Sequence, residues 1–209
     1  MQTGLQQDTP QQAGLLVIGH GTDSDSGRTE FNQAVGLISS LLPRVPLRAG
    51  FLEGTPSLES AGEAIIAAGM RQLIAVPLLH FSAAHAGREI PARLARLAGR
   101  APLVNIRHMP PIGCHPALVQ LSVNRYRQAL QSVRPPPAAR TLLLFVARGT
   151  HDHAAQKESR RYATLLADAA KPEKLVTCFI ANARPSLVEC AAAAAESPFE
   201  RVVVAPHLL

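Results

Sequence analysis

Aromatic residues are scarce in this 209-residue sequence, which has no tryptophan, two tyrosines and six phenylalanines. Proteins that bind single-stranded nucleic acid stack the bases on aromatic side chains, and this chain offers little for such a surface. Cysteine is scarce too: Cys114, Cys178 and Cys190 cannot all pair with one another and have no CxxC spacing. The sequence therefore indicates neither a disulfide framework nor a structural zinc site, and we expect a reducing compartment.

Long apolar runs are also missing from the sequence. No segment approaches the ~20 apolar residues that a membrane-spanning helix needs. Residues 1–13 are polar and rich in glutamine, without the basic start and apolar stretch of a signal peptide, and we interpret them as a disordered tail. The sequence thus predicts a cytoplasmic protein that makes no contact with membranes.

The charge balance indicates an anionic partner. Lysine and arginine outnumber aspartate and glutamate by 21 to 15, which gives a formal net charge of +6. The cations are scattered along the chain and form no basic block, so a nucleic-acid partner is not expected. With 47% hydrophobic and 17% charged residues, the composition is that of a folded globular protein.

Apolar segments of strand length alternate with longer helical patterns, which is typical of an α/β fold with mostly parallel sheets flanked by helices. In the first half the predicted strands are 14–19, 46–52, 72–78 and 102–107, and the predicted helices are 27–42, 56–68, 86–97 and 116–133. Three consecutive prolines, 135–137, can neither continue a helix nor enter a central strand. We therefore predict a first domain at 14–133 and a linker at 134–140.

The second half repeats the first at an offset of 128 or 129 residues, which indicates duplication. The matching segments are LLVIGHGT at 15–22 and LLFVARGT at 143–150, PSL at 56–58 and 185–187 with Glu59 and Glu189 behind them, and VPLL at 76–79 and APHL at 205–208. The second copy stops where its third strand should end. Residues 141–209 are thus predicted to be an incomplete, degenerate repeat.

His20 stands in a turn that suits ligand binding, Gly19-His20-Gly21-Thr22. The turn directly follows an apolar strand, and α/β proteins bind ligands at the carboxyl ends of their strands. Its glycines let the backbone turn sharply and let a bulky ligand come close. Considered alone, the same turn is compatible with an anion site at a helix N-terminus, and an isolated histidine is more often structural.

His85 follows the third predicted strand, so we expect it at the same edge of the sheet as His20. Neutral imidazole binds divalent Fe, Co, Ni and Zn. Two protein nitrogens leave the coordination sphere open, as a site that must release its metal requires, whereas structural zinc sites are closed by four ligands. Of the other histidines, His115 is predicted to cap the helix that follows it, and His80 to be a hydrogen-bonded residue near a strand end.

Taken in order, these motifs resemble the CbiX/SirB-type sirohydrochlorin chelatases, relatives of ferrochelatase among the class II chelatases. The resemblance covers about residues 14–209. It rests on GHGT at 19–22, FLE at 51–53 followed by PSL at 56–58, VPLLHFSAAHAGREIP at 76–91 and GCHP at 113–116. It implies two chelatase-like units, the first catalytic and the second truncated.

The resemblance implies insertion of Co²⁺ or Fe²⁺ into sirohydrochlorin or a related acidic tetrapyrrole, for cobalamin or siroheme biosynthesis. His20 and His85 would hold the metal, and Glu53 would be a metal-site or proton-accepting carboxylate. The metal is a substrate, Ni²⁺ remains a third candidate, and no organic cofactor is expected. The expected substrate-binding residues are Gly19, Gly21, Thr22 and Arg88, since arginine pairs well with a rim of carboxylates.

The sequence is compatible with two other functions. A histidine phosphatase also places a histidine after its first strand, but its chemistry needs an arginine directly before that histidine, where this chain has Gly19. A carrier that binds a tetrapyrrole or a metal without turnover would show the same residues as a chelatase. The sequence also leaves a homo-oligomer open. Because the second copy has Arg148 in place of His20, we expect a single metal site.

Overall fold

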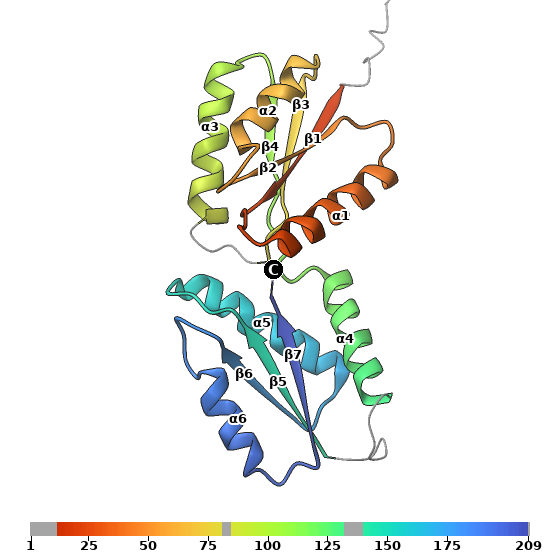
Figure 1. The fold of residues 1–209 in the computed structure, drawn as a ribbon, viewed down its shortest axis with the longest axis vertical. Helices are drawn as coiled ribbons and strands as arrows, with labels where there is room; N and C mark the ends of the chain where they lie inside the picture. Colours follow the sequence, from red (N-terminus) through yellow and green to blue (C-terminus); the bar gives the residue numbers. More distant parts are fainter. Residues whose placement is uncertain (1–11, 81–84, 132–139, 209) are drawn as a thin grey trace, which may run out of the picture. The chain divides into compact units, whose positions relative to one another are not determined.

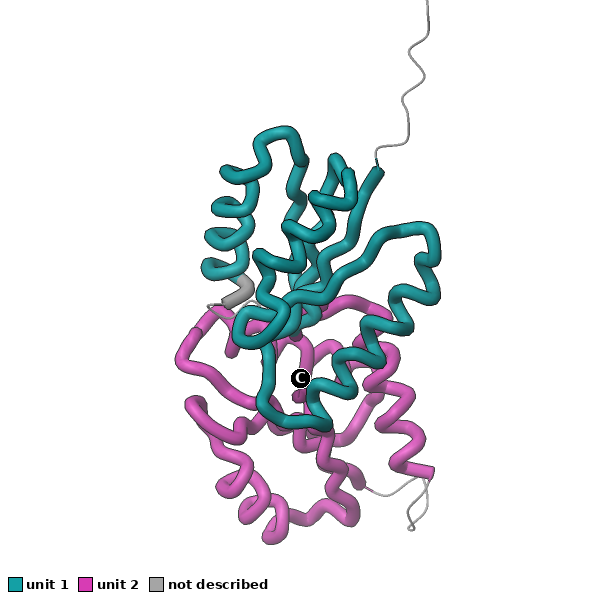
Figure 2. The backbone as a smooth tube through the Cα atoms, turned by 45° about the horizontal axis from the view of Figure 1, so that its top comes forward, with its two compact units in different colours: residues 1–79, 84–111 teal, residues 80–83, 112–209 magenta. Residues whose placement is uncertain are grey.

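A computed structural model describes residues 12–80, 85–131 and 140–208, except for the side chains of His85 and Ala86 (Figure 1). The chain divides into two compact units (Figure 2). The first unit comprises residues 1–79 and 84–111, and the second comprises residues 80–83 and 112–209. None of the helices described is both long and apolar enough to cross a membrane.

The first unit contains a parallel sheet whose described strands lie in the order β2-β1-β3-β4. Leu16, Val17 and Ile18 of the central strand are fully buried, as expected for a parallel strand covered on both faces. The strands are β1 (Ala13–Gly19), β2 (Leu47–Phe51), β3 (Gln72–Pro77) and β4 (Asn105–His108), and the helices are α1 (Asp25–Leu41), α2 (Leu58–Ala67), the π-helix η1 (His85–Glu89) and α3 (Ile90–Arg100).

The second unit contains a parallel sheet in the order β6-β5-β7. All seven residues of β5 are buried, and Phe145, Tyr162 and Phe179 are the largest side chains in the core. The strands are β5 (Thr141–Ala147), β6 (Lys174–Phe179) and β7 (Arg201–His207), and the helices are α4 (Pro116–Gln131), α5 (His153–Ala170) and α6 (Leu187–Ala195).

The position of α4 differs from the sequence prediction, which assigns residues 116–133 to the first domain. Val119, Val123 and Tyr126 of α4 lie in the core of the second unit. The Tyr162 hydroxyl of α5 also donates a hydrogen bond to the Leu118 carbonyl at 2.8 Å. The compact units therefore divide at residues 111 and 112 rather than at the predicted linker, most of which lies outside the described residues.

The duplication is visible in the backbone, since both sheets place their first strand between the second and the third. Shared details are a positive φ at Gly21 and Gly149, a hydrogen bond from Phe51 to Pro56 and from Phe179 to Pro185, and helix caps at Ser57 and Ser186. The caps correct one predicted match. Counted from the capping serine, Glu59 and Val188 are each the second residue of their helix and are therefore equivalent. Glu189 is the third residue of its helix.

The predicted elements of the first half correspond to the observed ones with one clear shift. The strand predicted at 102–107 is β4, which runs only from Asn105 to His108. The Val104 amide donates to the Ala101 carbonyl at 3.0 Å, so residues 101–104 form a turn that closes α3. Pro102 therefore belongs to this turn and not to the sheet.

Candidate functional site

His20 is the first residue after β1, the strand that lies between β2 and β3. Because these three strands are parallel, their carboxyl ends meet at one edge of the sheet, where ligands of α/β proteins commonly bind. The His20 side chain is half-buried, and its Nδ1 atom lies 3.4 Å from the carbonyl oxygen of Gly21. The structure thus places His20 at the edge that the sequence predicts.

Glu53 lies on the turn next to His20. The Glu53 amide donates a hydrogen bond to the His20 carbonyl at 2.8 Å, and the Leu52 amide donates to the Gly19 carbonyl at 3.0 Å. The Glu53 side chain is exposed. The turns after β1 and β2 are therefore joined by backbone hydrogen bonds, and they bring two of the predicted site residues into adjacent positions.

Gly19 and Gly21 are both closely packed in this turn. A Cβ atom at Gly19 would lie 2.6 Å from the ring of Phe31 in α1. Gly21 has a φ of 101°, and a Cβ atom there would lie 1.5 Å from the carbonyl oxygen of Glu53. Each glycine thus has a structural role, and their contact with a substrate stays a prediction.

We expect Gly21→Ala to destabilise the protein by about 2 kcal/mol or more, since it adds an unfavourable φ and a clash with the Glu53 backbone. Urea unfolding measures this change. Gly36→Ala is the matched control, because Gly36 lies in α1 with open space around its Cβ position. Alanine should stabilise that helix by roughly 0.5–1 kcal/mol. Equal stability of Gly21→Ala and the wild type would contradict this explanation.

Thr22 forms hydrogen bonds with residues at the start of α1. Its hydroxyl accepts a hydrogen bond from the Ser24 amide at 3.1 Å, and its carbonyl accepts one from Arg28 Nη1 at 3.2 Å. Ser24 in turn caps α1 by accepting from the Gly27 amide. Thr22 is exposed, so its hydroxyl can also meet a ligand, and its predicted role in substrate binding stays a prediction.

His85 is the first residue of η1, which continues directly into α3. The predicted convergence of the His20 and His85 rings lies outside the described residues, because the His85 side chain is not among them. Arg88, three residues further along η1, is exposed. Among the side chains that the structure describes, no three histidine, cysteine, aspartate or glutamate residues are grouped so that they could hold a metal ion.

Arg93 of α3 makes contacts that the sequence does not predict. Its Nη1 atom donates to the Leu52 carbonyl at 2.8 Å, and its Nε atom donates to Glu59 at 2.8 Å. A third contact, from Nη1 to Glu89, spans 3.3 Å. The hydrogen bond from Arg93 lowers the pKa of Glu59. Only the (i, i+4) spacing of Glu89 and Arg93 is a signal that the sequence contains.

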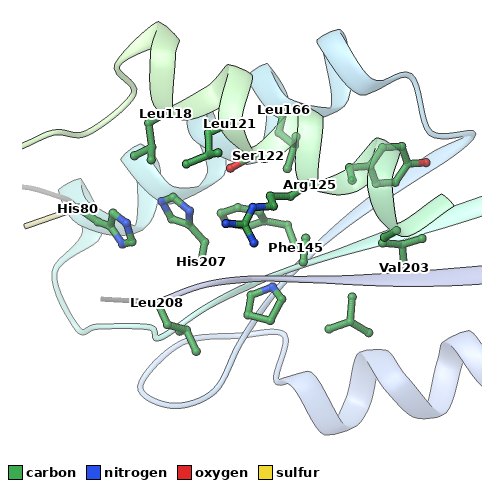
Figure 3. Close-up of a pocket in the computed structure, with 15 residues that line it drawn as sticks. His80, Leu118, Leu121, Ser122, Arg125, Phe145, Leu166, Val203, His207 and Leu208 are labelled. Atoms are coloured by element: carbon green, nitrogen blue, oxygen red, sulfur yellow. The ribbon is translucent and has the colours of Figure 1, made fainter. Parts of the chain in front are cut away.

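Two histidines of the second unit stack on one another beside a cavity (Figure 3). The rings of His80 and His207 are 3.9 Å apart at an angle of 17°, and the Tyr162 ring lies 4.1 Å from that of His207. Burial lowers the pKa of His80 to about 4 and is the main cause that lowers the pKa of His207 to about 3. Both rings are therefore neutral near pH 7.

The cavity beside these histidines has a volume of about 490 Å³. Its walls come from α4, β5, α5 and β7, with His80 at one end, and include Leu121, Arg125, Phe145, Val203 and His207 (Figure 3). It belongs to the second unit, whereas the described site residues His20 and Glu53 belong to the first.

His115 caps α4 as the sequence predicts. The Ala117 amide donates a hydrogen bond to His115 Nδ1 at 3.2 Å. This bond satisfies one of the amides that a helix leaves without a partner in its first turn. His115 is therefore explained by helix capping.

Comparisons with known proteins agree with the fold and with the motifs. Residues 14–129 and 142–209 match the family model described as CbiX. A sirohydrochlorin ferrochelatase of Priestia megaterium is 30% identical over 199 residues, which cover 93% of this chain and 72% of that protein. A sirohydrochlorin cobaltochelatase of the same organism is 23% identical over 199 residues, covering 93% of this chain and 63% of that protein.

Solved structures of similar proteins share the fold. The structure described as SirB from Bacillus subtilis with Fe³⁺ superposes with a TM-score of 0.85 at 24% identity, covering 95% of this chain and 77% of that one. The structure of CbiX, described as the terminal enzyme for biosynthesis of siroheme in denitrifying bacteria, has a TM-score of 0.67 at 25% identity. The match covers 92% of this chain and 78% of the CbiX chain.

Proposed function

The chain belongs to the CbiX family, and on this premise we propose that it inserts a divalent metal ion, Co²⁺ or Fe²⁺, into sirohydrochlorin or a related acidic tetrapyrrole. The observation that carries the proposal is the match, over nearly the whole chain, to a relative named for iron insertion. A second relative is named for cobalt insertion, so both metals are candidates. The metal ion is a substrate and leaves in the product.

The arrangement of His20 and Glu53 supports this chemistry. Metal insertion must strip water from the cation and remove two pyrrole N–H protons, so it needs a weak ligand and a nearby base. His20, at the carboxyl edge of the sheet, supplies an imidazole nitrogen, and the adjacent Glu53 supplies a carboxylate. We assign the second metal-binding nitrogen to His85, at the start of η1.

The acidic substrate gives the basic residues a role. Sirohydrochlorin carries a rim of acetate and propionate groups, and arginine binds such carboxylates through charge-assisted hydrogen bonds. Arg88 is exposed and lies three residues after His85, which makes it the nearest candidate for this contact. The net charge of +6 favours approach of an anion in general.

Incubation of the protein with sirohydrochlorin and Co²⁺, Fe²⁺ or Ni²⁺ under anaerobic conditions tests the function. We expect the absorption spectrum of the metallated product to develop faster than without protein, with Co²⁺, Fe²⁺ or both. Boiled protein controls for metal and buffer. Tetrapyrrole binding without acceleration would identify a carrier instead, and the absence of both would refute the proposal.

The histidine-phosphatase alternative has no support in the structure. Its chemistry requires an arginine directly before the first histidine, at the position of Gly19. A Cβ atom at Gly19 would lie 2.6 Å from the Phe31 ring, so an arginine side chain there would require that ring to move.

A further inference from the structure

We propose that Arg93 is a positioning residue for metal insertion, because it fixes the turn that carries Glu53 to the helix that begins at His85. The inference rests on the proposed function. Arg93 lies in α3, which continues directly from η1. Its side chain is only 12% exposed, whereas the side chains of Arg28 and Arg100 are 49% and 67% exposed.

One guanidinium joins three elements of the first unit. At the end of β2 it donates to the Leu52 carbonyl, at 2.8 Å. At the start of α2 it binds both carboxylate oxygens of Glu59, a pairing that the planar fork of arginine suits. Its contact with Glu89, at 3.3 Å, reaches the last residue of η1. Arg93 thus ties η1 and α3 to the turn after β2.

The peptide group between Leu52 and Glu53 is held on both sides. Its carbonyl oxygen accepts a hydrogen bond from Arg93, and its N–H donates to the His20 carbonyl at 2.8 Å. Because a peptide group is planar and rigid, holding both ends sets the direction in which the backbone of Glu53 continues. Arg93 therefore acts on Glu53, and on the turn of His20, through this one peptide group.

In the second unit the same turn forms although the residue equivalent to Glu59 carries no carboxylate. There the Ala181 amide donates to the Arg148 carbonyl at 2.9 Å, the same backbone bond as in the first unit. The residue equivalent to Glu59 is Val188, which has no carboxylate and is 79% exposed. The carboxylate that anchors Arg93 is therefore present in the copy that has His20 and absent from the copy that has Arg148.

The variant Arg93→Lys tests the proposal in the full-length protein. Lysine keeps the charge but lacks the planar fork, so it cannot bind both oxygens of Glu59 and reach Leu52 together. We expect kcat for metal insertion to fall roughly 10- to 100-fold, as for misplaced catalytic groups, with KM for sirohydrochlorin within about twofold. The matched control is Arg100→Gln, since Arg100 forms an exposed 3.0 Å ion pair between the same two helices, with Glu63. Its kcat should not change.

The double variant Arg93→Met with Glu59→Gln guards against a folding defect, because it removes both charges of the pair together. It should show the same loss of kcat, and the Glu53 amide should exchange its hydrogen about tenfold faster than in the wild type. Wild-type kcat in Arg93→Lys would overturn the proposal, as would an equal loss in Arg100→Gln. An inactive wild type would instead refute the function, and with it the reaction that Arg93 serves.

Discussion

Replacing His20 with alanine should reduce the metal-insertion rate at least 100-fold, a loss at the lower end of what a positioned acid–base or metal-binding group contributes. The expected cause is the loss of the imidazole nitrogen at the carboxyl edge of β1. His20 is half-buried and outside the core, so the free energy of unfolding should change by no more than about 1 kcal/mol. Anaerobic absorption kinetics and urea unfolding measure the two effects.

The control for this variant is His151→Ala, which removes an exposed histidine from the turn after β5 in the second unit. It should leave the rate unchanged. His85→Ala should behave like His20→Ala, because we assign both residues to the same metal ion. Full activity of either variant would remove that histidine from the mechanism, and a large loss of stability would mean that its role is structural.

Acidification should destabilise the second unit through His80 and His207. Their pKa values are about 4 and about 3 in the folded protein and 6.5 when unperturbed. As pH falls below 6.5, the unfolded chain takes up protons that the folded unit does not. The contribution of these two histidines to the free energy of unfolding is therefore fully present above pH 6.5 and is lost as the pH falls towards 4. At pH 5 the loss should reach at most about 2 kcal/mol for each histidine.

The two tyrosines provide the measurement. The chain has no tryptophan, and Tyr126 and Tyr162 both belong to the second unit, so tyrosine fluorescence follows the unfolding of that unit. Urea unfolding at pH 7.5 and 5.0 gives the loss of stability. In His207→Leu the loss should be roughly half as large, whereas His151→Leu should behave as the wild type does. An unchanged pH dependence in His207→Leu would contradict the assignment.

The α/β fold is predictable from the sequence because the strands are short apolar runs and the duplication lets each half check the other. The core into which α4 packs is not predictable from the sequence, since the apolar face of a helix does not indicate which sheet it will cover. In the structure, Val119 and Val123 lie in the core of the second unit. The shift of β4 has a similar cause. Nothing in the composition of residues 102–104 distinguishes a turn that closes a helix from the first residues of a strand.

The site is only partly predictable for the same physical reason. His20 and Glu53 follow adjacent strands, so the order of the strands is enough to bring them together. The contacts of Arg93 with Glu59 and Leu52 instead join residues 34 and 41 positions apart, and only packing creates them. One sequence difference between the copies accompanies the stack of His80 and His207: the first copy has Leu78 at the position of His207.

The turn shared by the two units separates two kinds of selection on one duplicated gene. A Cβ atom at Gly149 would lie 1.8 Å from the Ala181 carbonyl oxygen, so the second copy is held to glycine there as firmly as the first is at Gly21. One position earlier, the second copy has Arg148 where the first has His20, and the Arg148 carbonyl accepts the same backbone hydrogen bond. Where only the backbone conformation must be kept, position 148 can change to a residue with a different function. Position 149 must remain glycine.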